Sequence, residues 1–151
     1  MKRFCVIIPT YNNEGTIGRI VSQVLEQCAD VIVVNDGSTD RTHSILTSFP
    51  DITLVEYHRN RGKGYALKTG LRQALQMGFS YAITIDADGQ HYASDIAQFL
   101  TANQQHPGAL IVGSRQLEGT LQPKGSRRAN QISNFWFYVQ TGRRLADTQT
   151  G

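Results

Sequence analysis

Residues 81–90 read Tyr-Ala-Ile-Thr-Ile-Asp-Ala-Asp-Gly-Gln, an apolar run that ends abruptly in a polar turn. The apolar part, Tyr81–Ile85, is rich in β-branched and aromatic side chains, so it predicts a buried strand. Runs of the same type occur at Phe4–Ile8, Val31–Val34, Thr53–Tyr57 and Leu110–Val112. The sequence therefore predicts five short strands.

Segments with helical periodicity lie between these strands. Apolar residues recur every three or four positions, as on one face of a helix, in Ile17–Gln27, Arg41–Phe49, Gly64–Met77 and Ser94–Gln105. In the third segment one continuous apolar stripe is formed by Ala66, Leu67, Gly70, Leu71, Ala74 and Leu75. Short apolar strands that alternate with helices predict an α/β fold, in which a Rossmann-like, mostly parallel sheet carries helices on both faces.

Polar loops follow the first four predicted strands. They comprise residues 10–15, 36–40, 58–63 and 86–90. In an open parallel sheet, ligands bind outside the carboxyl ends of the strands. The four loops are far apart in sequence, yet the predicted fold brings them together at one edge of the sheet.

The turn after the fourth strand contains two carboxylates, Asp86 and Asp88, on either side of Ala87. Hard divalent cations such as Mg²⁺ or Mn²⁺ bind oxygen ligands, often one or two carboxylates together with substrate phosphates. The alternative is a solvated turn with a side-chain hydrogen bond to its own backbone. On these residues alone, both interpretations stay open.

The first two loops combine ligand-binding side chains with helix caps. Tyr11 offers an aromatic ring for a base and Glu14 a carboxylate, although the same loop also fits a turn capped by Asn13 or Thr16. In the second loop, we expect Asp36 to point at the ligand. We expect one of the residues Ser38–Asp40 to cap the next helix.

The third loop, Asn60-Arg61-Gly62-Lys63-Gly64, begins a predicted helix. A helix N-terminus with glycines and a lysine favours binding of an anion. The loop lacks the spacing of a phosphate-binding Walker sequence, and no Gly-x-Gly-x-x-Gly follows the first strand. These absences count against a kinase, an ATPase and a dehydrogenase.

Composition limits the class of protein. Apolar residues make up 40% of the chain and charged residues 18%, as in an ordinary globular protein. The length of 151 residues predicts a single domain, residues 1–151. The formal net charge of +3 does not indicate nucleic-acid binding. Cys5 and Cys28 have no disulfide or metal-site spacing, so we expect buried thiols in a reducing compartment.

The sequence contains no evident membrane-inserted segment. The apolar run near the N-terminus is too short for a signal peptide and is interrupted by Pro9. No stretch approaches the roughly 18 apolar residues of a transmembrane helix. We therefore expect a cytoplasmic protein, or one that is peripheral on the inner face of the membrane.

The ordered motifs of the chain resemble those of family 2 glycosyltransferases. They are Ile8-Pro9-Thr10-Tyr11-Asn12-x-Glu14, Val34-Asn35-Asp36-Gly37-Ser38-Thr39-Asp40, Asn60-x-Gly62-Lys63-Gly64-x-Ala66, Asp86-Ala87-Asp88-Gly89-Gln90-His91 and Gly113-Ser114-Arg115. Within this family, the chain is similar to polyprenol-phosphate glycosyltransferases such as dolichyl-phosphate mannose and glucose synthases. Asp147-Thr148-Gln149-Thr150-Gly151 resembles the start of that group's Asp-x-x-Ser-Gly-Phe segment.

The resemblance implies a GT-A fold and assigns roles on the donor side. A UDP- or GDP-sugar would be bound by Pro9, Tyr11, Glu14, Asp36, Lys63, Asp86, Ala87 and Asp88. A Mg²⁺ or Mn²⁺ ion would be held by Asp86, Asp88 and Gln90. Asn35 departs from the pattern, because many relatives have a second Asp there, and this leaves the nucleotide preference open.

On the acceptor side, the resemblance implies a polyprenyl phosphate bound by Arg115, Arg127 and Arg128. A phosphate monoester has a second pKa of about 6, so it is already an anion at neutral pH and needs no general base. A sugar hydroxyl would need a carboxylate base, for which Asp147 is the late candidate. Asp88 and Arg115 complete the predicted catalytic set.

The segment Arg127–Thr141 is predicted to be a helix that carries four consecutive aromatic residues, Phe135–Tyr138. With Lys124, Arg127 and Arg128 before them, these aromatics suit contact with a membrane surface. Packing of the same aromatics on the sheet is the alternative.

Three alternative functions follow from the same residues. The chain could bind a sugar nucleotide without transferring sugar, because related enzymes continue beyond the position of Gly151 and we expect the acceptor side to be truncated here. It could act on a saccharide hydroxyl in cell-envelope polysaccharide synthesis. A nucleotidyltransferase is disfavoured, since Pro9–Glu14 is not a Gly-rich basic loop.

Overall fold

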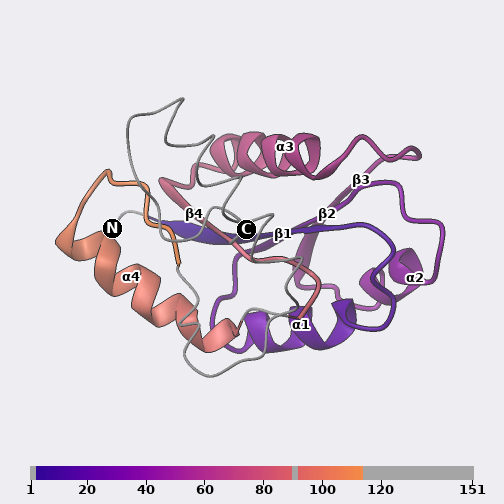
Figure 1. The fold of residues 1–151 in the computed structure, drawn as a ribbon, viewed down its shortest axis with the longest axis horizontal. Coiled ribbons are helices and arrows are strands. Elements are labelled where there is room, and N and C mark those ends of the chain that lie inside the picture. The colour runs from indigo at the N-terminus through magenta and orange to yellow at the C-terminus, as the bar shows by residue number, and fades with distance from the viewer. Residues whose placement is uncertain (1–2, 90–91, 114–151) are drawn as a thin grey trace, which may run out of the picture. The chain divides into compact units, whose positions relative to one another are not determined.

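The structure is a computed structural model that describes residues 3–89 and 92–113. The chain divides into two compact units, Met1–Gln105 and His106–Gly151. In the first unit, the described residues form a four-stranded sheet with the strand order β3-β2-β1-β4 (Figure 1). Its strands are β1 (Phe4–Thr10), β2 (Val31–Asn35), β3 (Ile52–Glu56) and β4 (Tyr81–Thr84).

All the strand pairs in this sheet are parallel, as predicted. Val6 in β1 is in register with Val31 in β2 on one side and with Ile83 in β4 on the other. β1 and β2 are central and buried almost throughout, because helices cover both of their faces.

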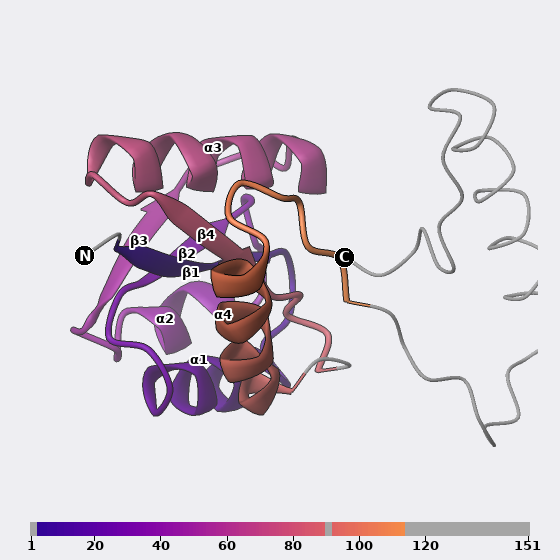
Figure 2. The ribbon, with the colours of Figure 1, turned by 90° about the vertical axis from the view of Figure 1, so that its left-hand side faces the viewer.

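The helices lie on opposite faces of this sheet, which confirms the predicted layering. They are α1 (Ile17–Leu25), α2 (Thr42–Leu46), α3 (Lys63–Gln76) and α4 (Ile96–Gln105), the last preceded by a 3₁₀ turn at Ala93–Asp95. Figure 2 shows α3 alone on one face, with α1, α2 and α4 on the other. The bounds agree with the predicted helices to within a few residues.

Two hydrophobic clusters fill these layers, and β1 contributes to both. Successive side chains of a strand point to opposite faces, so Cys5 and Ile7 pack under α3, whereas Val6 and Ile8 pack against α1. Cys5 and Cys28 are buried free thiols, as expected. Burial is the main cause that raises the pKa of Cys5 to about 11.

The apolar stripe on α3 is narrower than the sequence predicts. Ala66, Gly70 and Ala74 are buried, but Leu71 and Leu75 are 50% and 74% exposed. The reason is the close approach of α3 to the sheet at Gly70, where an added Cβ would lie only 2.5 Å from Ile7 Cγ2. The helix therefore rests on its small residues, and these leucines fall on its flank.

One predicted strand is absent from the described residues. In the described part of the second unit, the chain turns at His106, whose carbonyl accepts the N–H of Ala109 at 3.1 Å. Leu110–Val112 then continue without strand structure. The strand prediction here was wrong, because an apolar run becomes a strand only where a neighbouring strand completes its hydrogen bonds. The predicted helix Arg127–Thr141 lies outside the described residues.

Within the described chain, no helix combines the length and the apolar character needed to cross a bilayer.

The contact at Gly70 gives a test of the packing between α3 and the sheet. Replacing Gly70 by Ala should lower the free energy of unfolding by about 1–3 kcal/mol, because the new methyl group would overlap Ile7. Helix propensity alone would favour Ala by up to about 1 kcal/mol. Urea denaturation followed by circular dichroism measures the difference.

The matched control is Gly64→Ala in the same helix, where nothing lies within 4 Å of the added Cβ. It should leave the stability unchanged or raise it by up to about 1 kcal/mol. Equal stabilities of the Gly70→Ala variant and the wild type would contradict the close approach of α3 to Ile7 at Gly70.

Candidate functional site

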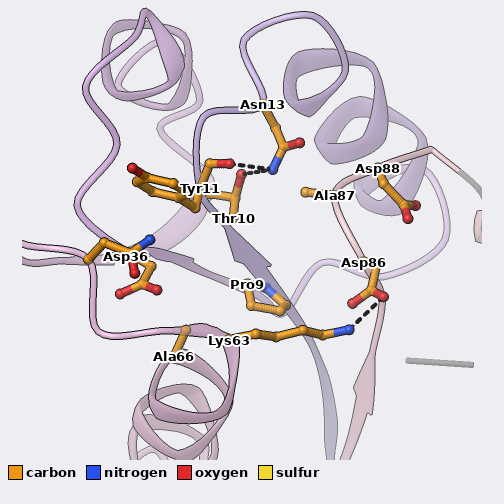
Figure 3. A pocket seen from close by; sticks show the side chains of 11 residues that line it. Pro9, Thr10, Tyr11, Asn13, Asp36, Lys63, Ala66, Asp86, Ala87 and Asp88 are labelled. Carbon is orange, nitrogen blue, oxygen red and sulfur yellow. Dashed lines mark hydrogen bonds and ion pairs between the residues drawn. The ribbon is translucent and has the colours of Figure 1, made fainter. Parts of the chain in front are cut away.

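A pocket of about 330 Å³ opens at the carboxyl edge of the sheet (Figure 3). It is lined by Pro9, Thr10, Tyr11, Asn13, Asp36, Asn60, Lys63, Ala66, Asp86, Ala87 and Asp88. These residues come from the ends of β1, β2 and β4 and from the start of α3. The predicted convergence of four loops at one edge is therefore confirmed.

The pocket has two sides of different chemistry (Figure 3). Tyr11, which is 45% exposed, lies with Asp36 on one side, and Asp86 and Asp88 lie on the other. The side chain of Lys63 extends between them to Asp86, where its Nζ lies 2.7 Å from Oδ2. An aromatic surface and a charged surface thus face a common space.

Asp36 is the most deeply buried carboxylate of the pocket, with 2% of its surface exposed. Its Oδ1 accepts the backbone N–H of Arg61 and its Oδ2 accepts that of Gly62, each at 2.8 Å. Gly62, at φ +91°, directly precedes the first residue of α3, Lys63. Asp36 therefore fixes where α3 begins, in addition to lining the pocket.

Aromatic contacts support the same loop from outside the pocket. The guanidinium of Arg61 lies 3.7 Å from the ring centre of Tyr65, which in turn meets the Tyr57 ring edge-on at 5.5 Å. Burial, followed by the neighbouring Asp36 carboxylate, raises the pKa of Tyr57 to about 12. The Tyr57 hydroxyl therefore stays protonated at neutral pH.

Glu14 does not line the pocket, although the resemblance implies that it contacts the nucleoside. Its Oε2 accepts the backbone N–H of Arg41 at 2.9 Å and the Nε–H of the same residue at 3.2 Å. These two hydrogen bonds, the backbone one first, hold the pKa of Glu14 below its usual value. The neighbouring Asp40 carboxylate also joins the two loops, since it accepts the N–H groups of Glu14 and Thr42.

Further hydrogen bonds join the loops after β1 and β2. The Asn12 N–H donates to Ser38 Oγ at 3.0 Å, and the Thr39 N–H donates to Asn12 Oδ1 at 2.8 Å. Asn12 adopts a left-handed conformation, φ +52°, that Asn tolerates better than most residues. The two loops consequently form one connected wall beside the pocket.

The segment Asp86-Ala87-Asp88 is fastened to α1. The Thr16 hydroxyl donates to the Ala87 carbonyl oxygen at 2.6 Å, and it makes no cap hydrogen bond to its own helix. Thr16 occupies the N-cap position of α1, as one of the predicted alternatives has it, but without a side-chain cap hydrogen bond. At α2 the N-cap position is Arg41 rather than a residue of Ser38–Asp40, although the Asp40 carboxylate accepts the N–H of Thr42. The contact from Thr16 holds the backbone between the two carboxylates.

The charges of the pocket favour a cation. Among the described residues that line the pocket, three carboxylates, of Asp36, Asp86 and Asp88, face one ammonium group, that of Lys63. The Asp36 carboxylate accepts two backbone N–H groups, so a hard cation in this pocket would be bound by the carboxylates of Asp86 and Asp88. Two carboxylates combined with substrate phosphates fit the ligand preference of Mg²⁺ or Mn²⁺. The described residues contain no cluster of three or more His, Cys, Asp or Glu that could hold a metal ion.

Some residues of the pocket were not singled out from the sequence, and some predicted residues are not described. Thr10 lines the pocket from the end of β1, Asn13 and Asn60 from the loops and Ala66 from the first turn of α3, and their signal was their place beside the carboxyl ends of the strands. The predicted residues outside the described ranges are Gln90, Arg115, Arg127, Arg128 and Asp147.

Comparison with known proteins adds a family and a fold. The family model described as Glycosyl transferase family 2 matches residues 5–149. A UDP-N-acetylglucosamine–dolichyl-phosphate N-acetylglucosaminyltransferase of Methanococcus voltae is 29% identical and covers 99% of this chain and 68% of its own length. A polyprenol monophosphomannose synthase of Mycolicibacterium smegmatis is 35% identical over 78% of this chain and 47% of its own length.

Among solved structures, mannosyl-3-phosphoglycerate synthase from Rubrobacter xylanophilus matches with a TM-score of 0.62 and 17% identity. The match covers 90% of this chain and 48% of that structure. This likeness concerns the fold, and it confirms the predicted GT-A class. The chain spans between about half and two thirds of the length of these relatives.

Removing the Asp36 carboxylate should loosen the start of α3. Asp36→Ala leaves two partly buried amide N–H groups without their acceptor, so we expect a loss of about 1–3 kcal/mol in the free energy of unfolding. The amides of Arg61 and Gly62 should exchange their hydrogens faster. The exposed Asp51, changed to Ala as a control, should alter neither measurement. Unchanged hydrogen exchange of these two amides in Asp36→Ala would contradict the role of Asp36 in fixing the start of α3.

The low pKa of Glu14 predicts a pH dependence of stability. A carboxyl group whose pKa is lower in the folded state stabilises it above the unfolded pKa, here close to the ordinary 4.5, and this contribution is lost as the pH falls through the folded pKa. Glu14→Gln should therefore lower the urea midpoint at neutral pH, and its difference from the wild type should shrink below pH 4.5.

The exposed Glu26→Gln is the matched control, with no such change expected. A difference between Glu14→Gln and the wild type that stays constant with pH would contradict the role of the Glu14 charge.

Proposed function

Because this chain belongs to glycosyl transferase family 2, we propose that it transfers a sugar from a nucleoside-diphosphate sugar to a polyprenyl phosphate at the membrane surface. The observation that supports the nucleoside-diphosphate sugar as donor is the two-sided pocket, in which Tyr11 lies opposite Asp86 and Asp88. The names of the relatives from Methanococcus voltae and Mycolicibacterium smegmatis support the acceptor class.

The donor nucleoside would lie on the Tyr11 side. An exposed ring beside a pocket suits stacking on a base, and Pro9 adds an apolar surface to the same pocket. The proposed donor is a UDP- or a GDP-sugar. Glu14 and Asp36 would then act mainly by holding the walls of the pocket, since their carboxylates bind backbone N–H groups.

The diphosphate would lie on the side of Asp86, Asp88 and Lys63. Asp86 and Asp88, with Gln90 two positions further along the sequence, would hold a Mg²⁺ or Mn²⁺ ion together with oxygens of the diphosphate. When bound, the cation neutralises the negative charge that develops on the leaving nucleoside diphosphate. Ala87, held by Thr16, keeps the two carboxylates on the pocket side.

The acceptor would attack the anomeric carbon from the side opposite the leaving group, with inversion. A phosphate monoester is already ionised at neutral pH, so the protein has to position it rather than deprotonate it. Arg115, Arg127 and Arg128 are the proposed ligands of this phosphate, because arginine binds phosphate oxygens in pairs. Peripheral contact with the membrane follows from the lipid acceptor.

The test is a turnover assay with the full chain. The protein is incubated with Mn²⁺ and a panel of UDP- and GDP-sugars, with polyprenyl phosphate, with an oligosaccharide or with neither, and the released nucleoside diphosphate is measured. Release that requires the lipid phosphate is expected. Binding without release would instead support a sugar-nucleotide-binding module, and release that requires an oligosaccharide would support a hydroxyl acceptor.

Asp88→Asn tests the proposed metal ligand without changing the size of the side chain. We expect kcat/KM to fall by roughly 10²–10³-fold, the range typical for loss of one electrostatic contact to developing charge. The control is Asp51→Asn, an exposed residue in the turn before β3 that should keep wild-type turnover. Full activity of Asp88→Asn would exclude Asp88 as a ligand of the divalent cation.

A further inference from the structure

Lys63 and Asp86 form an ion pair in the pocket, with 2.7 Å between Nζ and Oδ2. The Asp86 side chain is 19% exposed, whereas that of Lys63 is 52% exposed. Asp86 is also a proposed ligand of the divalent cation. The ammonium group of Lys63 therefore binds the same carboxylate that the cation would need.

The backbone of Lys63 is fixed, whereas its side chain is flexible enough to contact more than one partner in the pocket. The Asp36 carboxylate holds the two amides before Lys63, which sets the first turn of α3. Beyond this anchored backbone, the four-carbon stem of lysine is flexible and its charge is compact. Figure 3 shows the stem lying along the pocket, between the Tyr11 side and Asp86.

We propose that Lys63 is the counter-ion of Asp86 while no sugar nucleotide is bound, and that it releases Asp86 to the divalent cation when a diphosphate enters. The inference rests on the proposed function for the identity of the donor. A diphosphate offers the ammonium group new anionic partners in the same pocket. The exchange keeps both Asp86 and Lys63 paired with an opposite charge before and after binding.

This exchange makes the binding of the cation and of the nucleotide cooperative. Without nucleotide, the cation has to displace an ammonium group from Asp86, and like charges close together repel each other. With nucleotide, Lys63 has moved and the diphosphate adds oxygen ligands. By linkage, the nucleotide then raises the affinity for the cation by the same factor by which the cation raises the affinity for the nucleotide.

The test measures Mn²⁺ binding to the full chain by electron paramagnetic resonance, without and with UDP or GDP. Lys63→Met removes the charge but keeps a long side chain. Without nucleotide, it should bind Mn²⁺ about tenfold more tightly than the wild type, because one competing positive charge is gone. The ratio of the two Mn²⁺ dissociation constants, without and with nucleotide, should fall.

Two variants control for other causes. Lys63→Arg retains the charge and should stay close to the wild type. Lys68→Met removes an exposed cation from the same helix but outside the pocket, and should leave both dissociation constants unchanged. Thermal unfolding of each variant shows whether it is folded at the temperature of the titration.

The outcomes separate this inference from the proposed function. Equal Mn²⁺ affinities of wild type and Lys63→Met without nucleotide, or an unchanged ratio, would overturn the counter-ion role and leave the transferase proposal standing. A lack of nucleoside diphosphate release with every acceptor would overturn the transferase proposal, whatever the Mn²⁺ titrations show. A lack of Mn²⁺ binding in every variant, even with nucleotide, would overturn both the counter-ion role and the metal site.

Discussion

The hydrogen bonds of one buried carboxylate connect the sheet to the pocket. Asp36 follows β2, and its two oxygens bind the two amides that precede α3. A buried carboxylate is costly unless hydrogen bonds compensate its lost hydration, so the loop before α3 has to present those amides. The end of a central strand thereby fixes the first residue of a helix on one face of the sheet. Lys63 is that residue, and its reach into the pocket depends on this anchor.

The remaining walls of the pocket are held in a similar way, by contacts between loops rather than within them. Across the loops after β1 and β2, the Glu14 N–H donates to the Asp40 carboxylate and the Glu14 carboxylate accepts the Arg41 N–H, while Asn12 joins the same loops beside them. On the other side, Thr16 holds the backbone between Asp86 and Asp88. Such a pocket is largely formed before a ligand arrives, so little ordering is needed on binding. The side chain of Lys63, half-exposed and long, is the part best suited to move.

Charge bears on how a pocket lined by carboxylates would accept the proposed anionic donor. In the part of the chain that the structure describes, Asp36, Asp86 and Asp88 line the pocket with one ammonium group, that of Lys63. A diphosphate would be repelled unless a cation accompanied it, and Asp86 and Asp88 supply the oxygen ligands that hard cations prefer. The GT-A fold brings these groups together at one edge of the sheet.

The sequence by itself determined the sheet and the helices that cover its two faces, because buried strands and helices each have a characteristic spacing of apolar residues. β1 to β4, the helices between them, the buried Cys5 and the converging loops followed from that spacing. Tertiary structure alone decided that Leu71 and Leu75 lie outside the core and that Leu110–Val112 form no described strand. It also decided the partners of Glu14 and Thr16, which lie 27 and 71 residues away in the sequence. Local patterns report whether a residue is buried, but a hydrogen-bond partner so far along the chain is chosen only when the layers pack.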